Sequence, residues 1–255
     1  LATEFHEDLV AGYFSSIRNT MHNESCPKRQ VIIVSGVIIR NKSMNSVIEF
    51  FLHDYDDLPP ALARELYRLR RKTFRDRLDW KVECVEGMEK DQFDSHNTTY
   101  LLGMYDGQLL CGARFINATQ PTMISEIFHN YFDNPIIFPA DVPCCEVSRL
   151  FLDKEIRDSA SLHGVPASKA LFLAMNIYCM KNKYHGMYAV ASRGMYAIFR
   201  HANWKVEVIQ RGVSEKGEVI YYIYMPASTS IIEDIISKDK SSHWLREMLE
   251  HLRHL

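Results

Sequence analysis

One stretch of the sequence, residues 64–94, organises the rest of the chain. Its first part, residues 64–80, reads Arg-Glu-Leu-Tyr-Arg-Leu-Arg-Arg-Lys-Thr-Phe-Arg-Asp-Arg-Leu-Asp-Trp. Apolar residues recur at Leu62, Leu66 and Leu69, which is the spacing of one face of an α-helix. Pro60 precedes them, and proline is well tolerated in the first turn of a helix. We therefore predict an amphipathic helix that begins at the Pro-Pro pair and turns its leucines towards a core.

Aromatic and acidic side chains accompany this helix. Arg70 and Phe74 are four residues apart and share a helix face, and Trp80 follows just past the helix. Asp91 and Asp94 then add two carboxylates. A cationic ligand with planar groups would suit such a set, because aromatic faces and carboxylates both attract cations. The alternative is that the two aromatic residues belong to the core and that the charges form a solvated rim.

The composition indicates a globular protein without a membrane span. The chain has 255 residues, 47% of them hydrophobic and 24% charged. A net charge of -2 does not favour a nucleic-acid partner. The longest apolar run, Val31 to Ile39, is too short to cross a bilayer, and no signal-peptide cleavage pattern follows it. We expect a cytoplasmic protein that binds neither nucleic acid nor membrane.

The six cysteines predict neither a metal site nor a disulfide framework. They lack a Cys-x-x-Cys spacing, and an adjacent pair is not a zinc pattern. Free thiols in a reducing cytoplasm are the expected state. The cysteines are Cys26, Cys84, Cys111, Cys144, Cys145 and Cys179.

The first 43 residues differ from the rest. They hold polar segments around one apolar run, whereas the alternation typical of a strand begins after Met44. We predict that residues 1–43 are an N-terminal extension outside the domain, and that residues 44–255 form one domain.

The remaining pattern alternates strands with helices. Asp106-Gly107 joins two apolar runs and predicts a hairpin, and Pro166 and Ser192 mark the starts of two later helices. Such alternation indicates an α/β or α+β domain with helices on both faces of the sheet. The expected strands are 98–105, 108–116, 145–151, 186–191, 205–210 and 218–225, and the expected helices are 123–128, 166–183, 193–202 and one from Ser228 onward.

Together these pieces resemble the acyl-homoserine-lactone synthases, the autoinducer synthases of bacterial quorum sensing. The resemblance runs from about Met44 to Met225, and the order and spacing of its motifs make it specific. The motifs are Arg70-x3-Phe74-x5-Trp80, Asp91-x2-Asp94, Tyr100-Leu-Leu-Gly, Arg114-Phe, Pro121-x-Met123 and Glu146-x-Ser148-Arg149.

The resemblance implies a fold and a reaction. The fold would be α/β, similar to the Gcn5-related acyltransferases: an α/β/α sandwich around a mixed twisted sheet. The amine of S-adenosyl-L-methionine would attack an acyl thioester on acyl carrier protein. The methionyl carboxylate would then displace 5′-methylthioadenosine and close the lactone. S-adenosyl-L-methionine would be a substrate, so no cofactor and no metal is expected.

The same resemblance assigns roles to residues. Glu146 would be the base that takes the amine proton, with Ser148 and Arg149 as further catalytic residues. Strict strand alternation would place Glu146 and Arg149 on opposite faces, so we expect either a β-bulge or separate roles. Alternatively, Glu146 forms a structural ion pair with an arginine. The residues expected to bind S-adenosyl-L-methionine are Arg70, Phe74, Trp80, Asp91, Asp94, Arg114 and Phe128.

Two further sites follow from the resemblance. The acyl pocket would lie between the sheet and the helix that begins at Pro166, lined by Leu171, Met175 and Ala189. The alternative is that Leu171 and Met175, which stand at helical spacing, belong to the ordinary core. Ala189 stands where many family members that prefer 3-oxo chains carry Thr, so an unsubstituted chain is expected. The acidic carrier protein would dock on basic side chains, for which Arg193, Arg200 and Lys205 are the candidates.

Two other functions fit parts of the pattern. One is a Gcn5-like N-acyltransferase that uses acyl-coenzyme A, but the stretch Leu162-His-Gly-Val-Pro-Ala-Ser has one glycine where that class has a glycine-rich turn. The other is a catalytically silent module that binds S-adenosylmethionine, against which the presence of Glu146, Ser148 and Arg149 argues.

Overall fold

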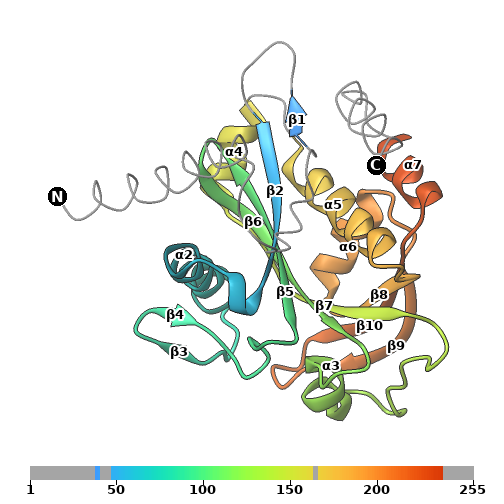
Figure 1. Cartoon of the computed structure of the whole chain (residues 1–255). Coiled ribbons are helices and arrows are strands. Elements are labelled where there is room, and N and C mark those ends of the chain that lie inside the picture. Colours follow the sequence, from blue (N-terminus) through green and yellow to red (C-terminus); the bar gives the residue numbers. More distant parts are fainter. Residues whose placement is uncertain (1–37, 41–46, 163–165, 238–255) are drawn as a thin grey trace.

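Eight of the described strands form one mixed sheet (Figure 1). The computed structural model describes residues 38–40, 47–162 and 166–237. The strand order is β1-β2-β5-β6-β7-β8-β10-β9, and among these described strands only the neighbours β7 and β8 run parallel. The strands are β1 (Ile38–Arg40), β2 (Val47–Asp54), β5 (Thr98–Tyr105), β6 (Gln108–Asn117), β7 (Cys144–Leu152), β8 (Gly186–Ser192), β9 (Glu207–Val213) and β10 (Val219–Pro226).

Helices cover both faces of this sheet. Helix α2 and the π-helix that continues it pack on one face, and α5, α6 and α7 pack on the other (Figure 1). The layers confirm the predicted α/β/α sandwich around a mixed sheet. The helices are α2 (Pro60–Arg71), the π-helix Lys72–Arg77, α3 (Met123–Glu126), α4 (Lys154–Leu162), α5 (Ala167–Lys181), α6 (Arg193–His201) and α7 (Thr229–Ser237), with 3₁₀ turns at Tyr55–Asp57 and Phe128–Tyr131.

Successive residues of the central strands feed two separate cores. On β5, Leu101 packs with the α5 layer, whereas Tyr100 and Leu102 pack with α2. The period of two along a strand produces this division. Leu62 and Leu66 meet the second group, as the helical spacing predicted.

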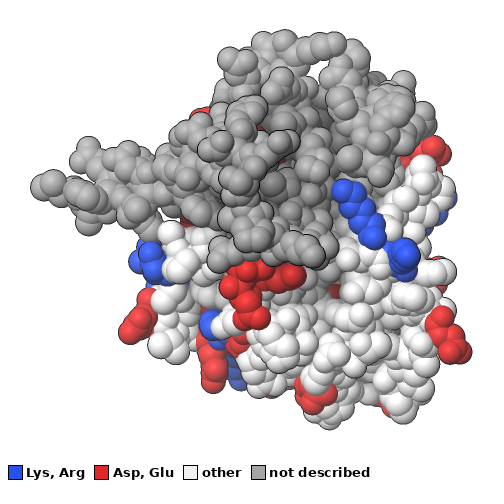
Figure 2. All heavy atoms as spheres, viewed as in Figure 1, with Lys and Arg blue, Asp and Glu red and all other residues white. Residues whose placement is uncertain are grey.

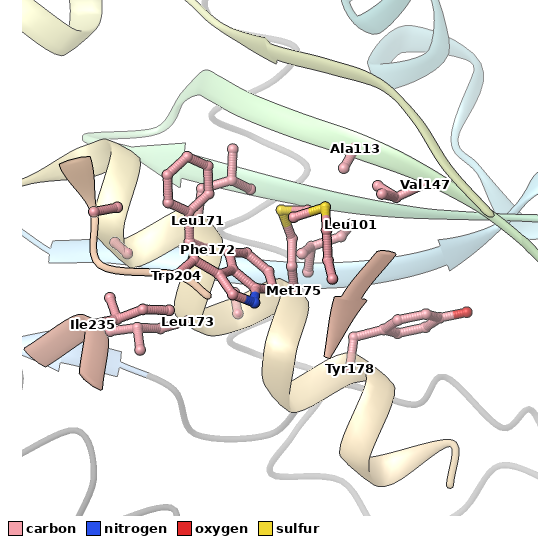
Figure 3. Close-up of a cluster of buried hydrophobic side chains, with 14 of the residues drawn as sticks. Leu101, Ala113, Val147, Leu171, Phe172, Leu173, Met175, Tyr178, Trp204 and Ile235 are labelled. Carbon is pink, nitrogen blue, oxygen red and sulfur yellow. The ribbon is translucent and has the colours of Figure 1, made fainter. Parts of the chain in front are cut away.

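The core on the α5 side is the larger one (Figure 3). Helix α5 is buried almost all round, and Leu171, Met175 and Tyr178 are each at most 6% exposed. The ring of Tyr178 lies 4.2 Å from that of Phe115 on β6, which fixes the helix against the sheet. Tight packing of this kind makes the helix a rigid wall.

The sheet consists of two halves that are joined over only three residue pairs. β7 and β8 pair from Cys144 opposite Gly186 to Glu146 opposite Tyr188. Beyond Glu146, β7 continues along β6 and β8 continues along β10, with no further pairing between the two strands in the described residues. Glu146 therefore stands at the point where the two halves separate.

Local turn and cap signals predicted several elements. The hairpin turns at Asp106 and Gly107, whose φ angles of 50° and 76° suit a two-residue turn. Ser192 caps α6 by accepting a hydrogen bond from the backbone N–H of Met195. Helix α4 and the small hairpin of β3 (Cys84–Val85) and β4 (Met88–Glu89) were not predicted.

Part of the predicted N-terminal extension belongs to the sheet. Ile38–Arg40 pairs with β2 as edge strand β1, opposite residues 47–49. Residues 1–37 and 41–46 lie outside the described residues, as does the tail from residue 238, so the boundary after residue 43 stays a prediction. None of the helices described in the structure has the length and apolar character required to cross a membrane.

Candidate active site

The carboxylate of Glu146 is the central group of the candidate site. Its side chain is 1% exposed, and Oε2 accepts a hydrogen bond of 2.7 Å from the backbone N–H of Ile124 in α3. Its Oε1 atom is buried and has no hydrogen-bond partner among the described residues. Glu146 therefore forms no ion pair with the described residues, and its Oε1 atom remains free to accept a proton.

Burial raises the pKa of Glu146 above that of an ordinary glutamate. The Ile124 N–H, the charge of Arg114, and the hydroxyl groups of Thr122 and Ser148 act in the opposite direction and limit the rise. A carboxylate with a raised pKa and an unpaired oxygen has the properties of a general base.

A β-bulge brings the third catalytic candidate to the same face. Ser148 lies opposite Arg114 and Phe151 lies opposite Gly112, so β7 has one residue more than β6 between these pairs. Arg149, in the bulge, has a φ of 51°, which is strained for a residue with a side chain. The bulge confirms the first of the two predicted ways to reconcile Glu146 with Arg149.

Three arginines and three carboxylates form a buried network beside this strand. Arg70 holds Asp94 with two hydrogen bonds of 2.7 and 3.0 Å and also bonds Glu89. Arg114 pairs with Asp91, and its Nη1 lies 3.1 Å from Asp94. Arg149 bridges Glu89 and Asp91 at 2.9 and 2.7 Å. The three carboxylates are thus committed to arginines, so they do not meet a ligand cation unpaired.

The network keeps the carboxylate of Asp94 charged. Burial alone would raise the pKa of Asp94, but Arg70 and Arg114 hold it well below its usual range. Tyr100 adds a hydrogen bond of 2.7 Å to the same carboxylate. Arg114 also donates to the hydroxyl of Ser148 at 3.1 Å, which connects the network to the strand that carries Glu146. We infer that the network orients β7 and the segment around residue 91.

Sequence reasoning missed Glu89, the residue that ties Arg70 to Arg149. It is 0% exposed and lies on β4, a strand of two residues. A strand this short has no periodicity to read. The only available signal was an acidic residue two positions before Asp91.

The aromatic candidates differ in their availability. Phe74 is 3% exposed, stacks on Trp80 at 5.2 Å, and lies 5.5 Å from the guanidinium of Arg149. Trp80 is only half-buried, so part of its surface is free. Phe128 is also half-buried and packs against the cluster of Phe93, Ile116 and Met123. Of the two aromatic residues next to Arg70 in the motif, Phe74 and Trp80, Trp80 is the more accessible to a ligand.

An open hollow of about 360 Å³ lies on the outer side of the network. Tyr67 lines it, and the Tyr67 hydroxyl lies 3.3 Å from that of Tyr100, which bonds Asp94. The hollow shares no residue with the predicted site. Its lining consists of Pro60, Ala63, Arg64, Tyr67, Val85, Met88 and Lys90.

The predicted acyl-pocket residues come together on the opposite face of the sheet. Ala189 packs in the same cluster as Leu171 and Met175, and all three are at most 7% exposed (Figure 3 shows the latter two). Glu146 lies on the other face but at the separation of the sheet halves.

The predicted docking residues are exposed but scattered. Arg193 and Arg200 stand at the two ends of α6, and Lys205 makes an ion pair of 2.7 Å with Asp234. Lys205 is exposed and Asp234 is half-buried, and an ion pair this close to the surface is weak enough to exchange for another carboxylate. On the face that Figure 2 shows, charges of both signs are interspersed among the described residues without one continuous basic patch.

Comparison with known proteins identifies the family. The family model described as autoinducer synthase matches residues 56–235. An acyl-homoserine-lactone synthase of Serratia liquefaciens is 44% identical over 181 residues, which are 71% of this chain and 90% of that protein. Another, of Yersinia enterocolitica, is 36% identical over 192 residues, or 75% and 89% of the two chains.

Solved structures agree with this at the level of the fold. TofI, in a ternary complex with an inhibitor and MTA, has a TM-score of 0.61 at 22% identity, covering 73% of this chain and 95% of that one. BjaI, a CoA-dependent acyl-homoserine lactone synthase solved with SAM and isopentyl-CoA, has a TM-score of 0.63 at 20% identity, covering 73% and 87%. The chain belongs to the autoinducer synthase family. It is an enzyme, and its class is that of the acyl-homoserine-lactone synthases.

Proposed function

We propose that this enzyme makes an N-acyl-L-homoserine lactone from S-adenosyl-L-methionine and an acyl thioester of acyl carrier protein, and releases 5′-methylthioadenosine. The observation that carries the proposal is the buried carboxylate of Glu146, with its free Oε1, at the separation of β7 and β8. The names of the relatives support the lactone product. The ligands named for TofI and BjaI support the adenosyl substrate.

Glu146 would act in the first step. The α-amine of S-adenosylmethionine is mostly protonated at neutral pH, since α-amino groups have a pKa of about 8. Oε1 would take a proton from the nitrogen, which then attacks the thioester carbon and expels the thiolate. Ser148 and Arg149 lie on the same face of β7 and would position this end of the substrate.

The second step, lactone closure, would require fewer catalytic groups from the protein. The methionyl carboxylate attacks the carbon next to the sulfonium, and the sulfonium leaves as methylthioadenosine. Closing a five-membered ring within one molecule is favoured by proximity. Trp80, the accessible aromatic face, would hold the adenosyl group or the cationic sulfur. The network of Arg70, Arg114 and Arg149 would support this end of the site.

The identity of the acyl donor is the finer part of the proposal. The single glycine at residue 164 favours a carrier protein, because a pyrophosphate-binding turn needs several free N–H groups. BjaI, in contrast, is named as a CoA-dependent acyl-homoserine lactone synthase.

Product analysis tests the function directly. Purified enzyme is incubated with S-adenosylmethionine and either acyl carrier protein thioesters or acyl-coenzyme A thioesters of equal chain length, and the products are identified by mass spectrometry. We expect acyl-homoserine lactone and methylthioadenosine in equal amounts, formed faster from the carrier protein. A linear N-acyl product without methylthioadenosine would support the alternative N-acyltransferase, and faster turnover of acyl-coenzyme A would overturn the choice of donor.

A further inference from the structure

A second buried polar group near Glu146 has no assigned role. Tyr222, on β10, is 1% exposed, and its hydroxyl makes no hydrogen bond within the described part of the chain. A buried hydroxyl without a hydrogen-bond partner lowers the stability of a fold. Phenylalanine would fill the same space without this penalty, so the presence of the hydroxyl calls for a functional explanation.

Tyr222 and Glu146 occupy the same region of the sheet. The ring of Tyr222 stacks on that of Tyr188 at 5.6 Å, and Tyr188 is the backbone partner of Glu146 in the parallel pairing. Both tyrosines pack in one cluster with Ile124, whose N–H binds the Glu146 carboxylate. The Tyr222 hydroxyl and the Oε1 atom of Glu146, both buried and unpaired within the described residues, therefore belong to residues that neighbour the same two residues, Tyr188 and Ile124.

Their chemistry is complementary to an aminolysis. The Glu146 oxygen accepts a proton, and a phenol donates a hydrogen bond. Attack of an amine on a thioester develops a positive charge on nitrogen and a negative charge on the carbonyl oxygen. A fixed donor aimed at the developing oxyanion is among the strongest sources of rate enhancement.

We propose that Tyr222 is a catalytic residue that donates a hydrogen bond to the carbonyl oxygen of the acyl thioester while Glu146 takes the amine proton. This inference rests on the proposed function. In the step, the nitrogen–carbon bond forms and the carbon–sulfur bond breaks. The ammonium nitrogen loses two protons in all: Glu146 takes the first, which frees the lone pair for attack, and the departing thiolate takes the second as the amide forms. Tyr222 keeps its own proton throughout.

The electrostatics agree with a phenol that donates without ionising. Burial raises the pKa of Tyr222 well above its ordinary value, and the charge of nearby Glu146 contributes to the rise. The hydroxyl is thus protonated at every pH at which the enzyme would work.

The first test compares two tyrosines on the same strand. Tyr222→Phe should lower kcat about 10- to 1000-fold, leave KM for S-adenosylmethionine within about twofold, and keep or raise the melting temperature. The matched control is Tyr224→Phe, because Tyr224 donates to the backbone carbonyl of His185 at 3.0 Å instead. The control should retain parental kcat. A lower melting temperature of Tyr222→Phe with parental kcat would show a structural hydroxyl and overturn the proposal.

The second test asks which substrate atom the hydroxyl meets. Two inert donor analogues are used: a ketone, in which CH₂ replaces the thioester sulfur, and a thioether, which lacks the carbonyl oxygen. Tyr222→Phe should weaken binding of the ketone about 3- to 10-fold and leave binding of the thioether unchanged. Equal weakening of both analogues would indicate altered packing and contradict the proposal. If the parent enzyme forms no lactone, the proposed function itself fails, whereas lactone formation with unaffected Tyr222→Phe removes only this inference.

Discussion

At the scale of single residues, neutralising the unpaired carboxylate of Glu146 and neutralising a carboxylate paired with arginine should change the stability of the fold in opposite directions. Glu146 has a raised pKa, so its charged form destabilises the fold at neutral pH. Its stabilising, protonated form is fully present below the unfolded pKa of about 4.3, and this contribution is lost as pH rises through the higher folded pKa.

We therefore expect Glu146→Gln to keep or raise the melting temperature at pH 7, with the difference from the parent vanishing in acid. The matched control is Glu89→Gln, which leaves Arg70 and Arg149 incompletely paired and should lose about 3–5 kcal/mol. Thermal unfolding from pH 4 to 8 measures both. A large loss in Glu146→Gln at pH 7 would support a structural role for Glu146 instead.

Asp94 represents the opposite case. Its pKa is lowered, so the stability that it contributes is present above the unfolded pKa of about 3.9 and is lost as pH falls through the folded value. Asp94→Asn should lower the free energy of unfolding by about 3–5 kcal/mol at pH 7 and flatten the loss of stability in acid. Chemical denaturation at pH 7 and pH 3 tests this, with exposed Asp106→Asn as the control. Parental stability of Asp94→Asn would mean that the network is not structural.

At the scale of secondary-structure elements, those defined by local sequence signals could be predicted, and those defined by long-range contacts could not. Pro60 and the Asp106-Gly107 turn fix backbone angles locally, so α2 and the β5–β6 hairpin could be predicted from the sequence alone. The bulge at Arg149 could be predicted only as one of two ways to bring motif residues together, because its position depends on the register with β6.

The site residues that could not be predicted from the sequence depend on tertiary contacts. Glu89 gains its role from arginines that lie 19 and 60 residues away in the sequence. Tyr222 lies in an apolar run of β10, where an aromatic residue reads as ordinary core. The sequence motifs identified the arginines, the aspartates and Glu146 as site residues. They could not show which carboxylates are paired with arginines, or that Oε1 of Glu146 is unpaired.

The contact between α5 and β8 determines the prediction on chain selection. Ala189 packs with Leu171 and Met175 and offers no hydrogen-bond donor. A buried 3-oxo group left unpaired loses about 1–3 kcal/mol, a bias of about ten- to hundredfold. We expect the unsubstituted product to dominate, and Ala189→Thr to shift the ratio towards the 3-oxo product. Equal amounts of the two acyl thioesters, analysed by mass spectrometry, give the ratio, and a parental preference for the 3-oxo chain would refute the role of Ala189.

At the scale of the whole molecule, the amino-terminal extension can be tested by truncation. A variant that begins at Met44 lacks β1, whose three residue pairs cover the edge of β2. Glu146 lies four strands farther into the sheet. We expect a loss of stability of about 1–2 kcal/mol with unchanged turnover, and a smaller loss for a variant that begins at Gly36. Loss of turnover on removal of residues 1–43 would show that the extension belongs to the functional domain.

In the proposed mechanism, residues on both faces of the sheet act together at Glu146, where β7 and β8 stop pairing. The network around Arg70 and Arg114 lies on one face and the cluster around Ala189 on the other. The proposed reaction depends most on the base at their junction, Glu146.

The pH dependence of the aminolysis rate tests that base most directly. If Glu146 removes the proton from the bound ammonium group, as we propose, the rate of the parent should reach its plateau near neutral pH. Glu146→Gln should be at least about 100-fold slower at pH 7, and its rate should keep rising up to about pH 8, where the α-amine loses its proton unaided. A Gln variant with the parental rate and profile would contradict the assignment of Glu146 as the base.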